Sequence, residues 1–242
     1  GSMARYVIDA YGDDAQHTAL LYVNVADVGD AAMSLVKSWT KAGVGMDYVQ
    51  AIDVAEFNYA PYVQQLKDRG IKVVHYIGPY QFTVRLQQAM AQQDYTPTAF
   101  IQDQTIYDQR YVDEAGDVGN GTVVYVSTAR FDDTSNKEMQ LYQQWLQQVR
   151  PGASPSIYGV YAWSATRLFV EQAVALGGRL TRETMIEALR KVRGWTGNQI
   201  HSPQEVGTKV TGKCIRVVQL EAGRWKQISP GDYLCSPLIS IA

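Results

Sequence analysis

The feature that most constrains the fold is an alternation of short apolar runs with longer segments of helical periodicity. The apolar runs cover residues 17–25, 46–54, 71–78, 97–103 and 120–129, and the helical segments cover 27–43, 58–70, 80–93 and 104–117. Short runs rich in β-branched and aromatic residues are typical of buried strands, and apolar residues three or four apart are typical of helices. Strands that alternate with helices imply crossover connections, so we expect an α/β fold with a doubly wound parallel sheet.

The pattern then changes to three consecutive helical segments, which are not a further strand–helix unit. They cover residues 134–152, 154–178 and 181–192. Ser135 and Glu138 have the spacing of a capping box at the start of the first segment. Thr181 is the predicted N-cap of the third.

The only two cysteines, Cys214 and Cys235, follow a loop at 194–212 and flank a predicted hairpin formed by 214–220 and 224–229. Their separation excludes a C-x-x-C redox motif, and the lack of nearby histidines argues against zinc. Two free core thiols or a disulfide remain. A second turn at "SPGDY" could return Cys235 to Cys214, which favours the disulfide. Such a bond would stabilise the fold by about 3 kcal/mol and indicate an oxidising compartment.

The amino-acid composition limits the class of binding partner that this chain can have. The 242 residues carry a net charge of −2, with 46% hydrophobic and 19% charged residues, so the chain can form one large domain or two lobes. The absence of a basic excess argues against nucleic acid or an anionic membrane as the main partner. No apolar run is long enough for a membrane span. The opening "GSM" is interpreted as a remnant of expression and is not used to predict the fold.

Sequence motifs for reaction chemistry are absent. There is no G-x-S-x-G, phosphate-binding loop, H-E-x-x-H or G-x-G-x-x-G motif. His17, His75 and His201 are interpreted as hydrogen-bonded polar residues rather than as catalytic groups or metal ligands. We therefore expect no catalytic residue, no metal and no cofactor. An enzyme with an active site assembled from distant residues remains an alternative.

Several stretches, in order, resemble a known family. They are "ALLYVNVADVGDAAMSLVKSW", "YAPYVQQLKDRGIKVVHYIGPYQFTVRLQQAM", "FIQDQTIY", "NGTVVYVSTARFDD" and "YGVYAWSATRLFVEQAV". Together they resemble the type I periplasmic binding proteins of ABC transporters, in the branched-chain amino acid receptor family. The closing "GKCIRVVQLEAGRW…YLC" is similar to the disulfide-closed tail of some bacterial members. The resemblance covers nearly all of residues 6–237.

The resemblance implies two doubly wound lobes that close on a ligand by a hinge. In these terms, residues 4–127 are expected to form the body of the C-lobe. Residues 128–204 would be the remnant of an N-lobe with a hinge crossing. Residues 205–242 would hold the return crossing and the C-terminal hairpin of the C-lobe. The first half of the N-lobe has no counterpart, so the expected fold is a C-lobe plus an incomplete N-lobe.

The strands that the three helices would cover in that family are missing from this sequence. Burying a Leu or Phe side chain contributes about 1.5–3 kcal/mol, so leaving an apolar stripe exposed is costly. The stripe includes Tyr161, Leu168, Phe169 and Leu176. The helices could pack back on the C-lobe, but we favour a homo-oligomer or a partner chain that covers them.

The resemblance also indicates ligand-binding positions after three strands. The first, near Val28, lacks the family's aromatic residue. The second falls on Tyr80, and the third, an acid in the family, falls on Gln104 beside Asp103. These residues and Tyr107 follow parallel strands, where ligand sites of open α/β sheets are found on general grounds. Alternatively, Tyr80 packs at a helix start and Asp103 acts as an N-cap.

The resemblance therefore implies an extracytoplasmic solute-binding protein of an ABC transporter, present in a truncated form. Its ligand would be amino acid-like or a small organic acid, and its native partner would be a membrane permease. It would perform no reaction. The alternative is a ligand-sensing or regulatory domain of the same fold.

Overall fold

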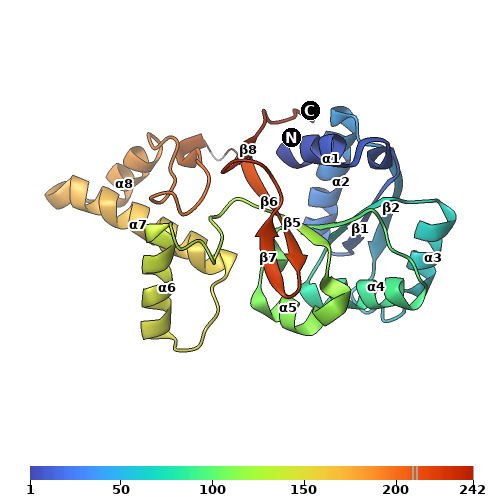
Figure 1. The fold of residues 1–242 in the computed structure, drawn as a ribbon. Coiled ribbons are helices and arrows are strands. Elements are labelled where there is room, and N and C mark those ends of the chain that lie inside the picture. The colour runs from blue at the N-terminus through green and yellow to red at the C-terminus, as the bar shows by residue number, and fades with distance from the viewer. Residues whose placement is uncertain (209, 211, 242) are drawn as a thin grey trace. The chain divides into compact units, whose positions relative to one another are not determined.

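The computed structural model describes residues 1–208, 210 and 212–241, and the chain divides into two compact units (Figure 1). Unit 1 comprises Gly1–Val126 and Val217–Ala242, and unit 2 comprises Ser127–Arg216. Lys209 and Thr211, in the predicted loop and return crossing, and Ala242 lie outside the described residues.

Unit 1 is built on a mixed sheet of order β2-β1-β3-β4-β5-β6-β7, with β8 paired to β6. Its strands are β1 (Thr18–Val23), β2 (Met46–Ile52), β3 (Val73–Ile77), β4 (Ala99–Gln102), β5 (Thr122–Val126), β6 (Cys214–Glu221), β7 (Arg224–Gln227) and β8 (Leu234–Cys235). The pairs from β2 to β5 are all parallel, and β6 pairs antiparallel with β7. The predicted α/β class and parallel sheet are therefore confirmed.

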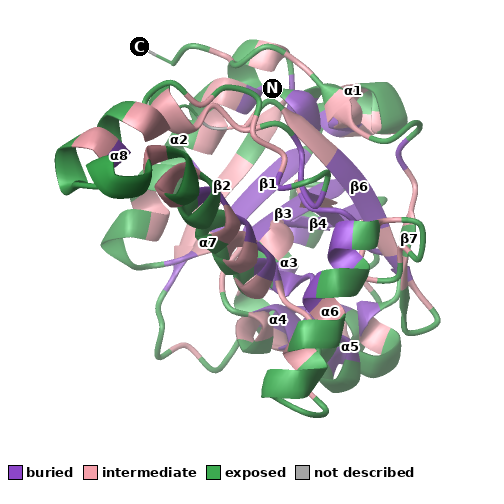
Figure 2. Ribbon diagram, turned by 90° about the vertical axis from the view of Figure 1, so that its left-hand side faces the viewer, coloured by how far each residue is buried: buried purple, intermediate pink, exposed green. Residues whose placement is uncertain are grey.

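Helices cover both faces of this sheet. They are α2 (Ala26–Ala42), α3 (Ala60–Asp68), α4 (Tyr80–Gln92) and α5 (Gln109–Ala115). Side chains alternate along β3, so Val74 and Tyr76 pack in one core with α3 and α4, whereas His75 stacks on Trp39 of α2. Figure 2 shows that β1, β3 and β4 are mostly buried. The doubly wound arrangement is thus a direct result of the strand pattern.

The expected single helix over 104–117 is divided into three short elements. They are η2 (Gln104–Ile106), α5, and η3 (Gly116–Gly119). Asp103 caps η2 by accepting a 2.7 Å hydrogen bond from the Thr105 amide, and Asp108 caps α5 by accepting one of 2.9 Å from the Arg110 amide. Each Asp restarts the helical turn, because its side chain competes with continuation of the preceding helix.

Residues 2 and 3 belong to the fold, which the interpretation of "GSM" as a remnant of expression did not predict. Ser2 and Met3 are only 6% exposed and begin α1 (Ser2–Tyr11), which is followed by η1 (Gly12–Gln16). Ser2 Oγ accepts a 3.0 Å hydrogen bond from the Ser236 amide. Met3 and Val7 are spaced four apart and are both buried, which gives this short helix an apolar face.

Unit 2 contains the three predicted helices. They are α6 (Lys137–Val149), α7 (Ile157–Leu176) and α8 (Arg182–Leu189), with short 3-10 turns η4 (Gly177–Arg179) and η5 (Val206–Thr208). Thr181 caps α8 as predicted, by accepting from the Thr184 amide. Over the described residues, every helix is too short or too polar to cross a membrane.

The predicted capping box of α6 was wrong. Asn136 is the N-cap, and its Oδ1 accepts a 2.9 Å hydrogen bond from the Met139 amide. Ser135 instead donates its hydroxyl to Asp133 at 2.6 Å. The Glu138 side chain does not return to the helix start; it enters the core of unit 2, where it is 6% exposed.

A small core holds unit 2 together. It is formed by Ala129, Met139, Tyr142, Val160 and Ile200. Of the predicted apolar stripe of α7, Leu168 is buried in the structure, whereas Phe169 is 52% exposed. Val174, five residues further on, is 76% exposed, and much of α7 is coloured as exposed in Figure 2.

The C-terminal prediction is confirmed in both parts. Strands β6 and β7 form an antiparallel hairpin, whose turn residues Ala222 and Gly223 have positive φ angles of 48° and 75°. A two-residue turn of this kind matches the right-handed twist of the flanking strands. Cys214 and Cys235 are joined in a disulfide, so the alternative of two free thiols is excluded.

Candidate functional site

The candidate site lies at the carboxyl edge of the parallel sheet of unit 1. Strand β3 ends at Ile77 and leads through Pro79 into Tyr80, the first residue of α4. Strand β4, its neighbour in the sheet, leads directly into Asp103 and Gln104. The sequence placed these residues after adjacent strands, and parallel pairing brings the two connections to the same edge. Tyr80, Asp103 and Gln104 are all partly exposed there.

A cation lies on the aromatic ring of this edge. The Arg110 guanidinium carbon is 5.5 Å from the centroid of the Tyr80 ring, within the range of a cation–π interaction. Asp108 holds that guanidinium through two hydrogen bonds of 3.0 and 2.7 Å. Burial alone would raise the pKa of Asp108, but the hydrogen bonds and charge of Arg110 outweigh it and lower the pKa below its ordinary value. Asp108 therefore stays ionised and positions Arg110 over Tyr80.

Asp103 uses one carboxylate oxygen as a cap and leaves the other available. Its Oδ1 accepts from the Thr105 amide, and among the described residues its Oδ2 has no hydrogen-bond partner. Burial and the nearby Asp103 charge both raise the pKa of the Tyr125 hydroxyl, so this phenol stays neutral beside the carboxylate. The N-cap interpretation is therefore correct, and it still leaves an oxygen that can accept from a ligand.

Tyr107 has a different place from the other three residues. It is 2% exposed, and its ring packs edge-on against Trp225 of β7, with centroids 5.5 Å apart. Val28 lies in the first turn of α2 and supplies no aromatic surface. The edge therefore presents Tyr80, Asp103 and Gln104, with Tyr107 packed beneath it.

Sequence reasoning missed the residues that support this edge, which are Arg110, Asp108 and Tyr125. A signal for the first two was available, because an Asp two residues before an Arg, just ahead of a helical segment, is typical of an N-cap. Nothing local pointed to Tyr125, since it reaches Asp103 only through the pairing of β4 with β5.

The nearest approach to a nucleophile–base pair is buried in unit 2. Ser164 Oγ lies 2.7 Å from His201 Nε2, the Trp195 indole donates to Ser164 Oγ at 2.8 Å, and His201 Nδ1 lies 2.8 Å from the Ser202 carbonyl. Ser164 and His201 are each 2% exposed, and a side-chain carbon at Gly197 would come within 2.5 Å of the Ser164 hydroxyl. Burial lowers the pKa of His201. The pair is a hydrogen-bonded core element with no room for a substrate.

The other histidines differ from each other. His17 Nδ1 pairs with Asp47 at 3.0 Å, in agreement with the prediction of a hydrogen-bonded residue. For His75 the prediction was wrong, because neither ring nitrogen has a partner among the residues described. The same residues contain no group of three or more His, Cys, Asp and Glu side chains that could hold a metal ion.

A protein-family model described as periplasmic binding protein matches residues 1–224, and the chain belongs to this family. Comparison with curated proteins gives no match. Comparison with solved structures gives similar folds at low sequence identity.

One similar fold is a branched-chain amino acid ABC transporter protein from Thermus thermophilus with bound valine, at 12% identity and a TM-score of 0.80. A second is an ABC transporter substrate-binding protein from Sphaerobacter thermophilus, at 20% identity and a TM-score of 0.77. A third is a leucine binding protein from Thermotoga maritima, at 12% identity and a TM-score of 0.74. In the order given, the three matches cover 97%, 96% and 96% of this chain. They cover 65%, 63% and 64% of the length of the three similar proteins. The likeness establishes the type I periplasmic-binding-protein fold, and the chain spans less than two thirds of these relatives.

Proposed function

We propose that the chain is the ligand-binding part of an extracytoplasmic solute-binding protein of an ABC transporter. It binds an amino acid-like molecule or a small organic acid, passes it to a membrane permease, and performs no reaction itself. Membership of the periplasmic binding protein family supports a binding role, and the disulfide supports an oxidising compartment. A ligand-sensing domain of the same fold is the alternative.

The observation that carries this proposal is the set of groups at the carboxyl edge of unit 1. Tyr80 offers a flat apolar face, and Arg110 above it offers a guanidinium suited to a carboxylate. The unpaired oxygen of Asp103 offers an acceptor for an ammonium group, with Gln104 beside it. Tyr107 would support the segment that carries Asp103 and Gln104, because its ring packs against Trp225. A zwitterion with a small side chain complements this combination.

We predict that the isolated chain binds such ligands only weakly, with dissociation constants on the order of 1 mM or above. The resembled proteins take part of their ligand contacts from a segment with no counterpart in this sequence. The measurement is an NMR titration of the chain with a panel of amino acids and small aromatic acids at millimolar concentration. The Asp103→Asn and Tyr80→Ala variants should each lose about tenfold in affinity, which corresponds to about 1.4 kcal/mol.

Glu114→Gln is the matched control, because Glu114 is exposed on α5 and lies outside the proposed set. It should bind as the unchanged chain does. Micromolar binding by the chain would contradict the prediction of weak affinity, and unchanged binding by both site variants would place the ligand elsewhere.

The exposed face of α7 supports a second part of the proposal, which concerns assembly. Phe169, Val170 and Val174 are 52%, 51% and 76% exposed, and Val170 and Val174, four residues apart, share one side of the helix. A second copy of this chain, or a partner chain, covers them, because soluble proteins rarely leave contiguous apolar surfaces exposed.

Sedimentation velocity across a concentration series should show self-association that the Phe169→Lys/Val174→Lys double variant abolishes. Val149→Lys, at an 80% exposed site on α6, is the control and should associate as before. A monomer at every concentration would exclude the homo-oligomer and leave the partner chain.

A further inference from the structure

Two buried side chains join the connections that carry the candidate site. Gln102, the last residue of β4, and Thr83, in the first turn of α4, are both fully buried. Gln102 Nε2 donates to Thr83 Oγ1 at 2.8 Å, and the Thr83 hydroxyl donates to the Pro79 carbonyl at 3.3 Å. Gln102 immediately precedes Asp103, and Pro79 immediately precedes Tyr80. The backbone segments that lead into the two site residues are therefore linked by hydrogen bonds.

The Thr83 hydroxyl fixes the orientation of the Gln102 amide. A threonine hydroxyl has one hydrogen, and here that hydrogen lies on the Pro79 carbonyl. The hydroxyl therefore accepts from Gln102, and the amide nitrogen faces α4. The amide oxygen Oε1 is buried and has no hydrogen-bond partner among the described residues. A buried acceptor without a donor lowers stability, so its retention in a folded protein calls for a functional explanation.

The start of α4 has no side-chain cap of its own. Its N-cap residue is Pro79, whose side chain makes no hydrogen bond to the helix. A helix start is usually stabilised by a Ser, Thr, Asp or Asn side chain at this position. The hydrogen bond from Gln102 instead attaches the first turn to the sheet through Thr83. It thereby fixes Tyr80, the first residue of α4, relative to Asp103, the first residue after β4.

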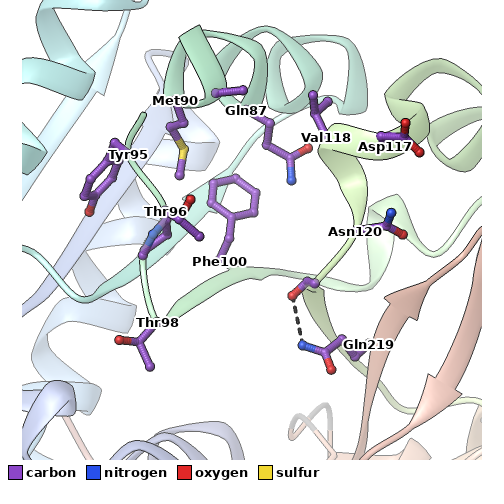
Figure 3. Close-up of a pocket in the computed structure, with 13 residues that line it drawn as sticks. Gln87, Met90, Tyr95, Thr96, Thr98, Phe100, Asp117, Val118, Asn120 and Gln219 are labelled. Carbon is purple, nitrogen blue, oxygen red and sulfur yellow. Dashed lines mark hydrogen bonds between the residues drawn. The ribbon is translucent and has the colours of Figure 1, made fainter. Parts of the chain in front are cut away.

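A second buried glutamine attaches α4 to the sheet away from the candidate site. Gln87 lies one helical turn after Thr83, beside a cavity of about 390 Å³ at the amino end of β4 and β5, and Figure 3 shows it projecting from the helix there. Its amide donates to Thr122 at 2.7 Å and accepts from Tyr111 at 2.8 Å. Both ends of this amide are used, so a structural role accounts for Gln87, whereas it leaves the Gln102 oxygen unexplained.

We infer that Gln102 is a positioning residue, which acts through Thr83 to fix the relative placement of Tyr80 and Asp103. This inference rests on the proposed function, in which the Tyr80 side of the site takes a carboxylate and Asp103 takes an ammonium group. A ligand that uses both groups gains from their fixed placement, because less order has to be imposed on binding. A ligand that lacks the ammonium group gains nothing from it. Gln102 therefore determines how well the site distinguishes a zwitterion from a carboxylate of the same shape.

The test uses phenylalanine and 3-phenylpropanoate, which share a ring and a carboxylate and differ in the ammonium group. An NMR titration of the intact chain should show the tighter binding for phenylalanine. Gln102→Leu and Thr83→Val should each weaken phenylalanine binding about fivefold and change 3-phenylpropanoate binding by less than about twofold. Thr83→Ser, the conservative variant, keeps the hydroxyl and should restore the preference. A general loosening of the fold would weaken the binding of both probes to the same extent.

Denaturant unfolding separates positioning from a purely structural role. Gln102→Leu removes an unpaired buried acceptor together with one hydrogen bond, so the unfolding midpoint should change little. Gln87→Leu is the matched control, because it also replaces a buried glutamine between α4 and the sheet. It removes two hydrogen bonds and should lower the midpoint, while the ratio of the two probe affinities stays the same.

The outcomes distinguish this inference from the proposed function. A Gln102→Leu variant that keeps the ratio of the two affinities, or that loses both probes equally, would overturn the inference and leave the proposed function in place. A Thr83→Ser variant that behaves as Thr83→Val does would also overturn it, because the hydroxyl would then not be the link. An unchanged chain that binds neither probe, or shows no preference for phenylalanine, would contradict the proposed function and the inference together.

Discussion

Lowering the pH from 7 to 5 is expected to reduce the free energy of unfolding by about 2 kcal/mol through His75 alone. His75 lies in the middle of β3 with no exposed surface. Its ring stacks on Trp39 with centroids 5.1 Å apart and meets Tyr125 edge-on at 5.9 Å. Neither ring nitrogen has a partner among the described residues, so nothing there would stabilise the imidazolium.

The sign of this pH effect follows from the difference in the pKa of His75 between the folded and unfolded states. Burial lowers the pKa of His75 from 6.5 to about 3. Below pH 6.5 the unfolded chain takes up a proton that the folded chain does not, so stability falls by up to about 1.4 kcal/mol per pH unit. The loss begins near pH 6.5 and continues until the pH approaches 3, and above pH 7 this residue causes no further change.

The other groups with shifted pKa values determine the pH range in which the effect of His75 on stability is best measured. Burial also lowers the pKa of His201, so that residue adds a loss of the same sign. The pKa values of Asp108 and Asp133 lie below their ordinary value near 3.8, and the stability they contribute is lost only in more acidic solution. Burial also lowers the pKa of the Gly1 amino group, which adds a loss of the same sign. Denaturant titrations at pH 7, 6 and 5 therefore report mainly on the histidines and on this amino group.

The decisive variant is His75→Leu, which places an apolar side chain among Trp39 and Tyr125. Its stability should depend less on pH by about 2 kcal/mol between pH 7 and 5, while the contributions of His201 and of the Gly1 amino group remain. His17→Gln is the control, because His17 lies at the surface with its side chain 55% exposed. A His75→Leu variant with the slope of the unchanged chain would contradict the explanation.

Glu138→Ala is expected to destabilise unit 2 by about 3 kcal/mol. The Glu138 carboxylate is almost fully buried and accepts hydrogen bonds from Trp163 at 2.8 Å, Arg167 at 3.0 Å and Asn198 at 3.1 Å. These donors come from α7 and from the loop that follows α8. Removing the carboxylate leaves two neutral donors and part of a guanidinium without an acceptor in a small core.

Denaturant unfolding followed by far-ultraviolet circular dichroism suits this measurement, because unit 2 is mostly helical. Glu138→Gln keeps one acceptor oxygen and should lie between the unchanged chain and Glu138→Ala. Glu171→Ala removes a more exposed i,i+4 partner of Arg167 and should cost about 0.5 kcal/mol or less. If Glu138→Ala were no more harmful than Glu171→Ala, the buried cluster would not hold unit 2 together.

Patterns within a single element were readable from the sequence. The strand runs predicted the parallel sheet, and the turn residues Ala222 and Gly223 predicted the hairpin. Hydrogen bonds between side chains that are far apart in the sequence could not be predicted. Glu138 has the spacing of a cap, but it is more stable beside Trp163 and Arg167 than at an exposed helix start. The helix over Ser2–Tyr11 was not predicted, and its first two residues belong to the "GSM" that was interpreted as a remnant of expression.

The candidate site, too, could be predicted from the sequence only in part. The order of strands predicted that Tyr80 and Asp103 would share an edge, because consecutive parallel strands end on one side. The cation over Tyr80 required knowledge of how α5 is oriented, and that orientation is set by the Asp108 cap.

Unit 2 is an insertion within unit 1. The chain leaves unit 1 after β5 at Val126 and returns at Val217 in β6, and these two strands are neighbours in the sheet. Insertions between adjacent chain ends are tolerated because they leave the host's register unchanged. Residues 127–213 can therefore diverge, lengthen or be exchanged while the sheet that leads into Tyr80 and Asp103 is preserved. Such a design is modular: one recognition surface can be kept through evolution, or in engineering, while the inserted half is replaced.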